Sequence, residues 1–156
     1  MNKKKFCSFF VSECHLLTIL LPYINEELSN SKNVEIILEE DMIENVKKYL
    51  KVNNIYNVSK IIKLGWKKTK KENVECNENT DTAVIIGHEK FLEHVNKILD
   101  NNKKVKKVIN CYNIETVTNL KDIVMKHDFV LKTNGLEEIQ KSSHNEQKRK
   151  TIQTQI

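Results

Sequence analysis

The feature that most constrains the fold is the alternation of short strand-like apolar runs with segments of helical periodicity. Residues 83–87 (AVIIG) are almost purely apolar, as expected of a strand that is covered on both faces. Residues 91–99 then repeat apolar side chains every three or four positions, which is the spacing of one helix face. This alternation predicts an α/β domain of three layers, with a largely parallel central sheet of five to six strands.

The same patterns extend along most of the chain. Further strands are predicted at residues 5–11, 33–38, 60–66 and 105–112, and a last one begins at residues 129–131. Helices are predicted after the N-cap Ser12, after Asp41 and within residues 114–125, and Pro22 predicts a kink or a break in the first of them. Residues 67–82 have the polar composition of a loop.

The N-terminal segment has a basic start followed by apolar residues, as a secretory signal does. A signal needs an unbroken apolar run of roughly 7–15 residues and a small-residue cleavage site. Here residues 12–15 (SECH) interrupt the run, and no such site follows Pro22. A membrane span would need about 20 apolar residues, and Glu13 lies in the middle of the segment. We therefore predict a strand and a helix, in a cytoplasmic protein without a membrane segment.

The net charge of +5 gives little support for nucleic-acid binding. Residues 141–156 contain four basic residues and one acidic residue, so the rest of the chain carries only +2. The single arginine, Arg149, lies in that tail, whereas arginine is the usual bidentate ligand of phosphate and guanine. A lysine-dependent nucleic-acid binder that uses the tail and residues 67–71 (KKTKK) is the least favoured of the functions considered.

Length and composition predict one domain followed by a tail. A chain of 156 residues with 39% hydrophobic residues can bury one core and is too short for two ordinary domains. We assign residues 1–136 to a single α/β domain of the sensory type. Residues 137–156 lack apolar periodicity and are predicted to form a disordered basic tail.

No cofactor-binding, metal-binding or catalytic motif is present. The three glycines are far apart, so the chain has neither a P-loop nor a G-x-G-x-x-G segment that would let backbone N–H groups approach a phosphate. The four cysteines are also far apart and lack the paired spacing of a structural zinc site. We therefore predict no cofactor, no metal ion and no catalytic residue.

The candidate ligand-binding residues are those predicted at strand ends. Ligands of open α/β sheets bind beyond the carboxyl ends of the strands. Phe10, Trp66 and Tyr112 combine this placement with an aromatic ring. Two further candidates are the thiol of Cys111, within the same strand as Tyr112, and the imidazole of His127, just before the last strand. Each has an alternative interpretation: Cys111 as a buried core residue, Trp66 as packing on the sheet, and His127 as a polar residue at the start of a strand. If His127 opens its strand, it should lie at the opposite end of the sheet from Tyr112.

Several of these segments resemble the MEDS family, the sensory domain of methanogen and methylotroph regulators that is named for a dichloromethane-responsive repressor. The segment PYI-x-E-x-L resembles the family's PFI-x-x-GL motif, and the ending CYN…KHDFVL places Cys111, Tyr112 and His127 in matching positions. The resemblance covers roughly residues 5–133. It departs from the family at Glu27 and Asn113, where the family has glycine and aspartate. The resemblance implies an α/β fold of the RecA/KaiC type without the ATP-binding loop.

Two classes of function follow from these observations. The first is a non-catalytic regulatory or sensory domain that binds a small molecule or a protein partner and acts in signalling or transcriptional regulation. The second is a small enzyme whose site lies at the strand C-termini and uses Cys111, His127 or Glu39. The shortage of organised ionisable groups beside Tyr112 and Trp66 favours the first.

Overall fold

The computed structural model shows an α/β domain built on one mostly parallel sheet. It describes residues 3–39, 48, 67–69 and 79–140. Within these residues the sheet has seven strands: β1 (Lys4–Phe10), β2 (Val34–Glu39), β3 (Lys67–Thr69), β4 (Thr82–Gly87), β5 (Lys107–Asn113), β6 (Phe129–Lys132) and β7 (Gly135–Glu138). Their order is β3-β2-β4-β5-β1-β6-β7, and all neighbours are parallel except β6 and β7. The predicted α/β class with a largely parallel sheet is confirmed, and the sheet has seven strands where five to six were predicted.

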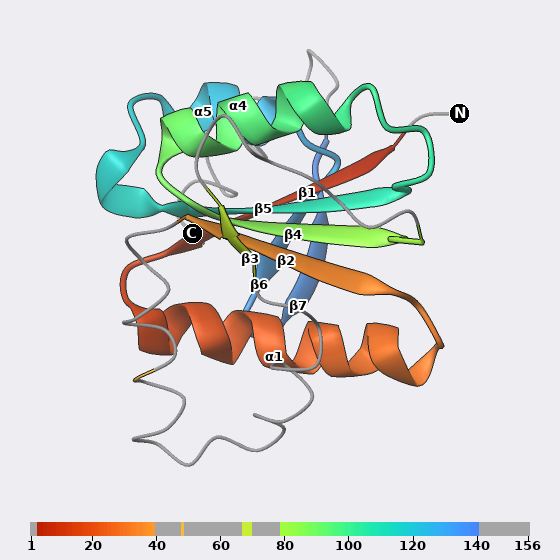
Figure 1. The fold of residues 1–156 in the computed structure, drawn as a ribbon. Helices are drawn as coiled ribbons and strands as arrows, with labels where there is room; N and C mark the ends of the chain where they lie inside the picture. The colour runs from red at the N-terminus through yellow and green to blue at the C-terminus, as the bar shows by residue number, and fades with distance from the viewer. Residues whose placement is uncertain (1–2, 40–47, 49–66, 70–78, 141–156) are drawn as a thin grey trace.

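Helices cover both faces of the sheet (Figure 1). The helix α1 (Glu13–Ser29) lies on one face, and α4 (Glu89–Leu99) and α5 (Leu120–Met125) lie on the other. The right-handed rule for parallel crossovers accounts for this division. The chain crosses the sheet in one direction from β1 to β2, and in the opposite direction from β4 through β5 to β6.

Each face of the sheet buries its own apolar cluster. Alternate residues of a strand point to opposite faces, so Phe6 and Phe10 pack under α1, whereas Cys7 and Phe9 pack under α4 and α5. The predicted strand at residues 83–87 lies inside β4, in which every residue is buried. Among the described residues, no helix is both long and apolar enough to cross a membrane.

The N-terminal elements follow the sequence pattern closely. The N-cap of α1 is Ser12, as predicted, and its hydroxyl accepts a hydrogen bond of 3.2 Å from the backbone N–H of His15. The prediction of a break at Pro22 is wrong, because α1 continues through this residue as one helix. The burial of Leu20 and Ile24 on either side of Pro22 holds both halves of the helix against the sheet.

Other boundaries differ from the predictions. The predicted helix within residues 114–125 is a short 3-10 helix, η2 (Ile114–Thr116), followed by an extended Val117 and then by α5. The side chain of Asn119 caps α5 by accepting from the N–H of Asp122, which starts the helix later than predicted. Part of the predicted loop at 67–82 forms β3 and the start of β4. The predicted helix after Asp41 and the strand at 60–66 lie outside the described residues.

The ordered domain also extends beyond its predicted boundary at residue 136. The strand β7 pairs with β6 through Glu138, and Ile139 is buried. The first three residues of the predicted tail, 137–139, therefore belong to the folded domain. The remaining tail, from residue 141, lies outside the described part of the chain.

Candidate functional site

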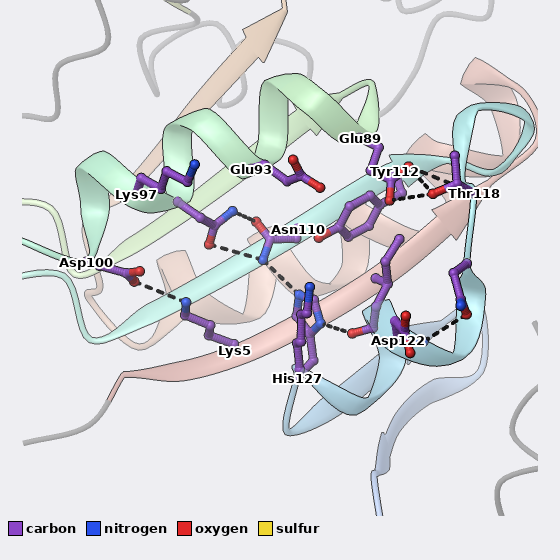
Figure 2. A pocket seen from close by; sticks show the side chains of 14 residues that line it. Lys5, Glu89, Glu93, Lys97, Asp100, Asn110, Tyr112, Thr118, Asp122 and His127 are labelled. Carbon is purple, nitrogen blue, oxygen red and sulfur yellow. Dashed lines mark hydrogen bonds and ion pairs between the residues drawn. The ribbon is translucent and has the colours of Figure 1, made fainter.

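A groove of about 590 Å³ runs between α4 and α5, above β5 and β1 (Figure 2). Its floor contains Lys5 of β1 together with Asn110 and Tyr112 of β5, because alternate residues of these strands face this side of the sheet. The volume is in the range of small-molecule binding sites, roughly 300–1,000 Å³. The groove is therefore large enough for a metabolite-sized ligand.

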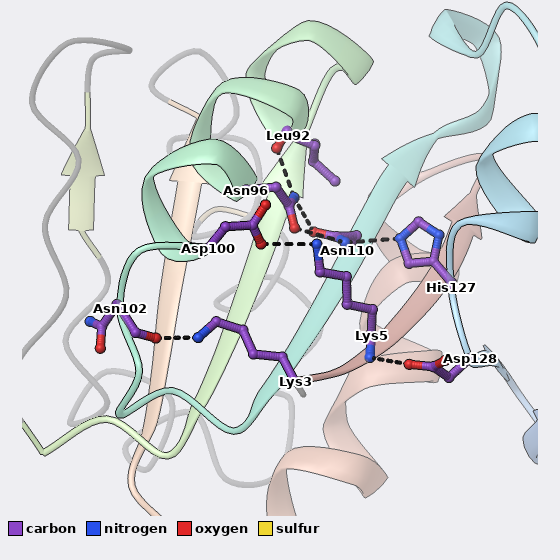
Figure 3. A network of polar contacts seen from close by, with 9 residues as sticks. All are labelled: Lys3, Lys5, Leu92, Asn96, Asp100, Asn102, Asn110, His127 and Asp128. Carbon is purple, nitrogen blue, oxygen red and sulfur yellow. Dashed lines mark hydrogen bonds and ion pairs between the residues drawn. The ribbon is translucent and has the colours of Figure 1, made fainter. Parts of the chain in front are cut away.

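A buried polar network lies at the centre of the floor (Figure 3). Asn110 is 1% exposed, and its neighbours in register are the apolar or weakly polar Ile85 and Cys7. Its side-chain oxygen accepts a hydrogen bond of 2.8 Å from Asn96 of α4, and its side-chain nitrogen lies 2.9 Å from Nε2 of His127. The network thus ties α4, β5 and the end of α5 together beneath the groove.

These contacts determine which nitrogen of His127 carries the hydrogen. Nδ1 lies 2.6 Å from the carbonyl oxygen of Ile123, which can only accept, so Nδ1 donates. Nε2 then accepts from the amide nitrogen of Asn110. The arrangement fits a neutral imidazole, and it holds the ring in one orientation against Tyr112, with the ring centroids 6.0 Å apart.

The hydroxyl group of Tyr112 has no hydrogen-bond partner among the described residues, although this side chain is only 6% exposed. Its ring stacks on Phe9 at 5.6 Å and meets His127 edge-on, so its direction along the groove is fixed. Burial, followed by the charges of nearby groups that include Glu89 and Glu93, raises the pKa of the phenol. Tyr112 therefore stays protonated, and its hydroxyl can donate a hydrogen bond to a group in the groove or accept one from it.

Charged side chains form the walls of the groove. The acidic ones are Glu89, Glu93, Asp100 and Asp122, and the basic ones are Lys5, Lys97 and Lys126. Lys5 and Asp100 form an ion pair of 3.0 Å, and Glu89 accepts hydrogen bonds from the backbone and hydroxyl of Thr118. Glu93, Lys97 and Lys126 make no ion pair within the described residues, so their charges are available to a ligand.

The structure separates the five predicted ligand-binding residues. Tyr112 and His127 both line the groove. Phe10 and Cys111 are buried on the opposite face, in the cluster under α1, because Cys111 and Tyr112 are consecutive in a strand and point in opposite directions. Trp66 lies outside the described residues. The grouping of Phe10 and Cys111 with Tyr112 is therefore incorrect.

The predicted position of the site also needs correction. His127 was expected at the far end of the sheet from Tyr112, yet their rings are in contact. The reason is that His127 precedes β6 and lies above the sheet, so its ring reaches the middle of β5. Likewise, the groove lies along the face of the sheet and extends to Lys5 near the start of β1, rather than lying beyond the strand C-termini.

A separate histidine–carboxylate pair does lie at the strand C-termini. Glu39 ends β2, and its Oε1 accepts from the backbone N–H of His88 at 2.8 Å and lies 2.6 Å from Nδ1 of the same residue. Gly87 permits this approach, because a Cβ atom there would lie 2.7 Å from Glu39 Oε1. A carboxylate on Nδ1 orients an imidazole so that Nε2 can exchange protons with a substrate.

The buried thiols do not suit nucleophilic chemistry. Cys7, Cys14 and Cys111 are free, but Cys7 and Cys111 are fully buried. Burial raises the pKa of the Cys7 thiol to about 12 and raises the pKa of Cys111 as well. A reactive cysteine needs thiolate character and access to solvent. Cys111 is therefore better described as a core residue than as a nucleophile.

Most of the groove residues were not identified from the sequence. Glu89, Glu93, Lys97 and Asp100 follow one another at intervals of three or four, which was visible as a polar stripe beside the apolar stripe of α4. Such a stripe ordinarily faces solvent, so it does not by itself indicate a site. The stronger signal was Asn110, a polar residue at the centre of the otherwise apolar run 108–112 of β5.

Neither a metal centre nor a known relative defines the site. Within the described ranges, no group of three or more His, Cys, Asp or Glu side chains is arranged to hold a metal ion. In comparisons with known proteins, no family model, curated protein or solved structure matches the chain.

Proposed function

We propose that this chain is a sensory domain that binds a small molecule in the groove between α4 and α5 and transmits the binding event to a protein partner. The observation that carries the proposal is the Tyr112 hydroxyl, which faces a groove of about 590 Å³ and has no hydrogen-bond partner in the described chain. A hydroxyl group that faces the groove without a protein partner can hydrogen-bond a ligand there, and one such hydrogen bond contributes about 0.5–1.5 kcal/mol to binding.

Features of the surrounding elements support a regulatory role. The groove is formed by two helices that contact the sheet through one shared network, Asn96–Asn110–His127. A ligand that contacts both helices can therefore change their relative positions and so alter a surface that a partner recognises. The resemblance to the MEDS family agrees with a role in signalling or transcriptional regulation. We place the protein in the cytoplasm, which fits the free thiols of Cys7 and Cys14.

Removal of the Tyr112 hydroxyl tests this function. We expect native mass spectrometry of the purified protein to show a retained small molecule, and we expect Tyr112→Phe to weaken its binding about tenfold. The matched control is Tyr23→Phe, because Tyr23 lies on α1, on the opposite side of the sheet, and donates to Glu27. Equal retention in wild-type protein and Tyr112→Phe would contradict the proposal.

The pair of His88 and Glu39 supports a second candidate function, a small enzyme with a general base at the strand C-termini. The 2.6 Å contact orients the ring, and the His88 side chain is 41% exposed, so Nε2 can reach a substrate. If this function holds, His88→Gln should lower hydrolysis of p-nitrophenyl acetate or phosphate at least about a hundredfold and leave binding in the groove unchanged. Absence of turnover by the wild-type protein on both esters would argue against it.

A further inference from the structure

The groove between α4 and α5 has ends of opposite charge. Both helices follow parallel strands and run back across the same face of the sheet, so their N-terminal turns lie at the same end of the groove. On α4, Glu89 and Glu93 occupy the first half and Lys97 the last turn; on α5, Asp122 lies in the first turn and Lys126 is the C-cap. Figure 2 shows Glu89 at the opposite end of α4 from Lys97.

The acidic end contains more than carboxylates. The Tyr112 ring lies at this end, its side chain is nine-tenths buried, and its hydroxyl has no hydrogen-bond partner among the described residues. A phenol can accept a hydrogen bond from a cation and donate one to an oxygen, so it complements an ammonium group held by Glu93. An unpaired carboxylate and an unpaired hydroxyl together favour a cationic group that carries several N–H donors.

The basic end favours an anion for the same reason. Lys97 and Lys126 have no ion-pair partner in the described part of the chain, whereas Lys5 is paired with Asp100. Between the two ends, the Asn110 and His127 side chains satisfy each other's hydrogen bonds and add no net charge. The middle of the groove therefore suits an uncharged portion of a ligand.

We propose that the groove binds a zwitterion whose ammonium group lies between Glu93 and Tyr112 and whose carboxylate lies near Lys97 and Lys126. This inference rests on the proposed sensory function and names its class of ligand. A diamine would place a cation at the lysines, and a dicarboxylate would place an anion at the glutamates. Both should therefore bind more weakly than a zwitterion of the same length.

The spacing of the charges narrows the class further. Glu93 and Lys97 are four residues apart on α4, a rise of about 6 Å along the helix axis. An α-amino acid carries both charged groups on one carbon, so it has no uncharged portion to lie over Asn110 and His127 between the two ends. An ω-amino acid or a dipeptide carries them several bonds apart, and we assign the groove to ligands of this kind.

A chain-length series of ligands provides the test. We expect amide chemical shifts of α4 and α5 in two-dimensional NMR spectra to respond to 5-aminopentanoate, 6-aminohexanoate and glycylglycine at lower concentrations than to glycine. Butylamine and pentanoate are 5-aminopentanoate without its carboxylate and without its ammonium group, and each should bind at least about tenfold more weakly than 5-aminopentanoate. Glu93→Gln and Lys97→Met should each weaken the binding of the ω-amino acids about tenfold. The control Lys90→Met should leave this binding unchanged, because Lys90 is an exposed residue of α4 that does not line the groove.

The possible outcomes distinguish this inference from the proposed function. If butylamine binds in the groove as tightly as 6-aminohexanoate, the zwitterion inference is overturned and the groove remains a ligand site. If no compound of the series shifts α4 or α5 at millimolar concentration, the inference is also overturned. The proposed function is then decided separately by the adduct retained in native mass spectrometry and its dependence on Tyr112.

Discussion

Asn110→Ala is expected to lower the free energy of unfolding by about 3 kcal/mol. The substitution removes the 2.9 Å contact to Nε2 of the buried His127 and the 2.8 Å hydrogen bond from Asn96, which keeps its hydrogen bond of 2.7 Å to the Leu92 carbonyl. Loss of the hydrogen bond to the buried His127 costs about 1–3 kcal/mol, and the vacated volume beneath the groove adds a cavity term. Urea denaturation followed by circular dichroism gives the change.

The control for this variant is Asn101→Ala. Asn101 is exposed and follows α4, so the same chemical change there should alter stability by less than about 0.5 kcal/mol. A double-mutant cycle with Asn96→Ala separates the network from local packing, because the two effects should be clearly less than additive if the side chains act together. Additive losses, or a loss for Asn110→Ala as small as that of Asn101→Ala, would show that the network does not hold the groove in place.

The core elements of the fold were predictable because their patterns are local. The continuous apolar run of β4 and the apolar stripe of α4 placed both elements within a few residues of their observed bounds. β7 was missed because GLEE has no apolar period, and it forms by pairing with β6 across a two-residue turn. The sequence did leave a signal beside the turn Thr133-Asn134, because Gly135, which opens β7, adopts the positive φ of 124° that glycine tolerates.

The candidate site was predictable only in part, because it depends on strand order. A sequence identifies a helix such as α4 and its polar stripe, but not the helix that lies beside that stripe. Here β5 and β6 are separated in the sheet by β1, so the chain between them carries α5 across to form the second wall of the groove. His127 and Tyr112 could thus be named as candidates, whereas Glu93 and Lys97 had the appearance of solvent-facing residues.

The groove also differs from the usual ligand position in open α/β sheets, which is the crevice where neighbouring strands send their connections to opposite faces. That crevice lies between β1 and β5, since β1 leads to α1 and β5 leads to α5. The chain there contains no glycine: Val11 and Ser12 follow β1, and Asn113 ends β5. The unpaired groups lie instead on the sheet face, which is why we place the ligand between the helices.

The second large effect is expected at Glu27, a buried carboxylate that joins the end of α1 to the N-terminal edge of the sheet. It is 5% exposed and accepts from the Tyr23 hydroxyl at 3.1 Å, from the Thr82 hydroxyl at 3.2 Å and from the Lys107 ammonium at 3.2 Å. Three donors on one carboxylate offset the cost of burying its charge, and removal of the carboxylate leaves all three without this acceptor.

Glu27→Ala should therefore destabilise the domain by about 3 kcal/mol, which is a large part of the total stability of a domain of this size. The loss should stay near this value and not reach the upper range for buried ion pairs, because Lys107 is partly exposed and water can solvate its ammonium group. The matched control is Glu26→Ala, an exposed neighbour on the same helix, for which we expect less than about 0.5 kcal/mol. Urea denaturation of both variants measures the difference. Similar small losses in the two would show that α1 is held to the sheet by its apolar face alone, through residues such as Leu20 and Ile24.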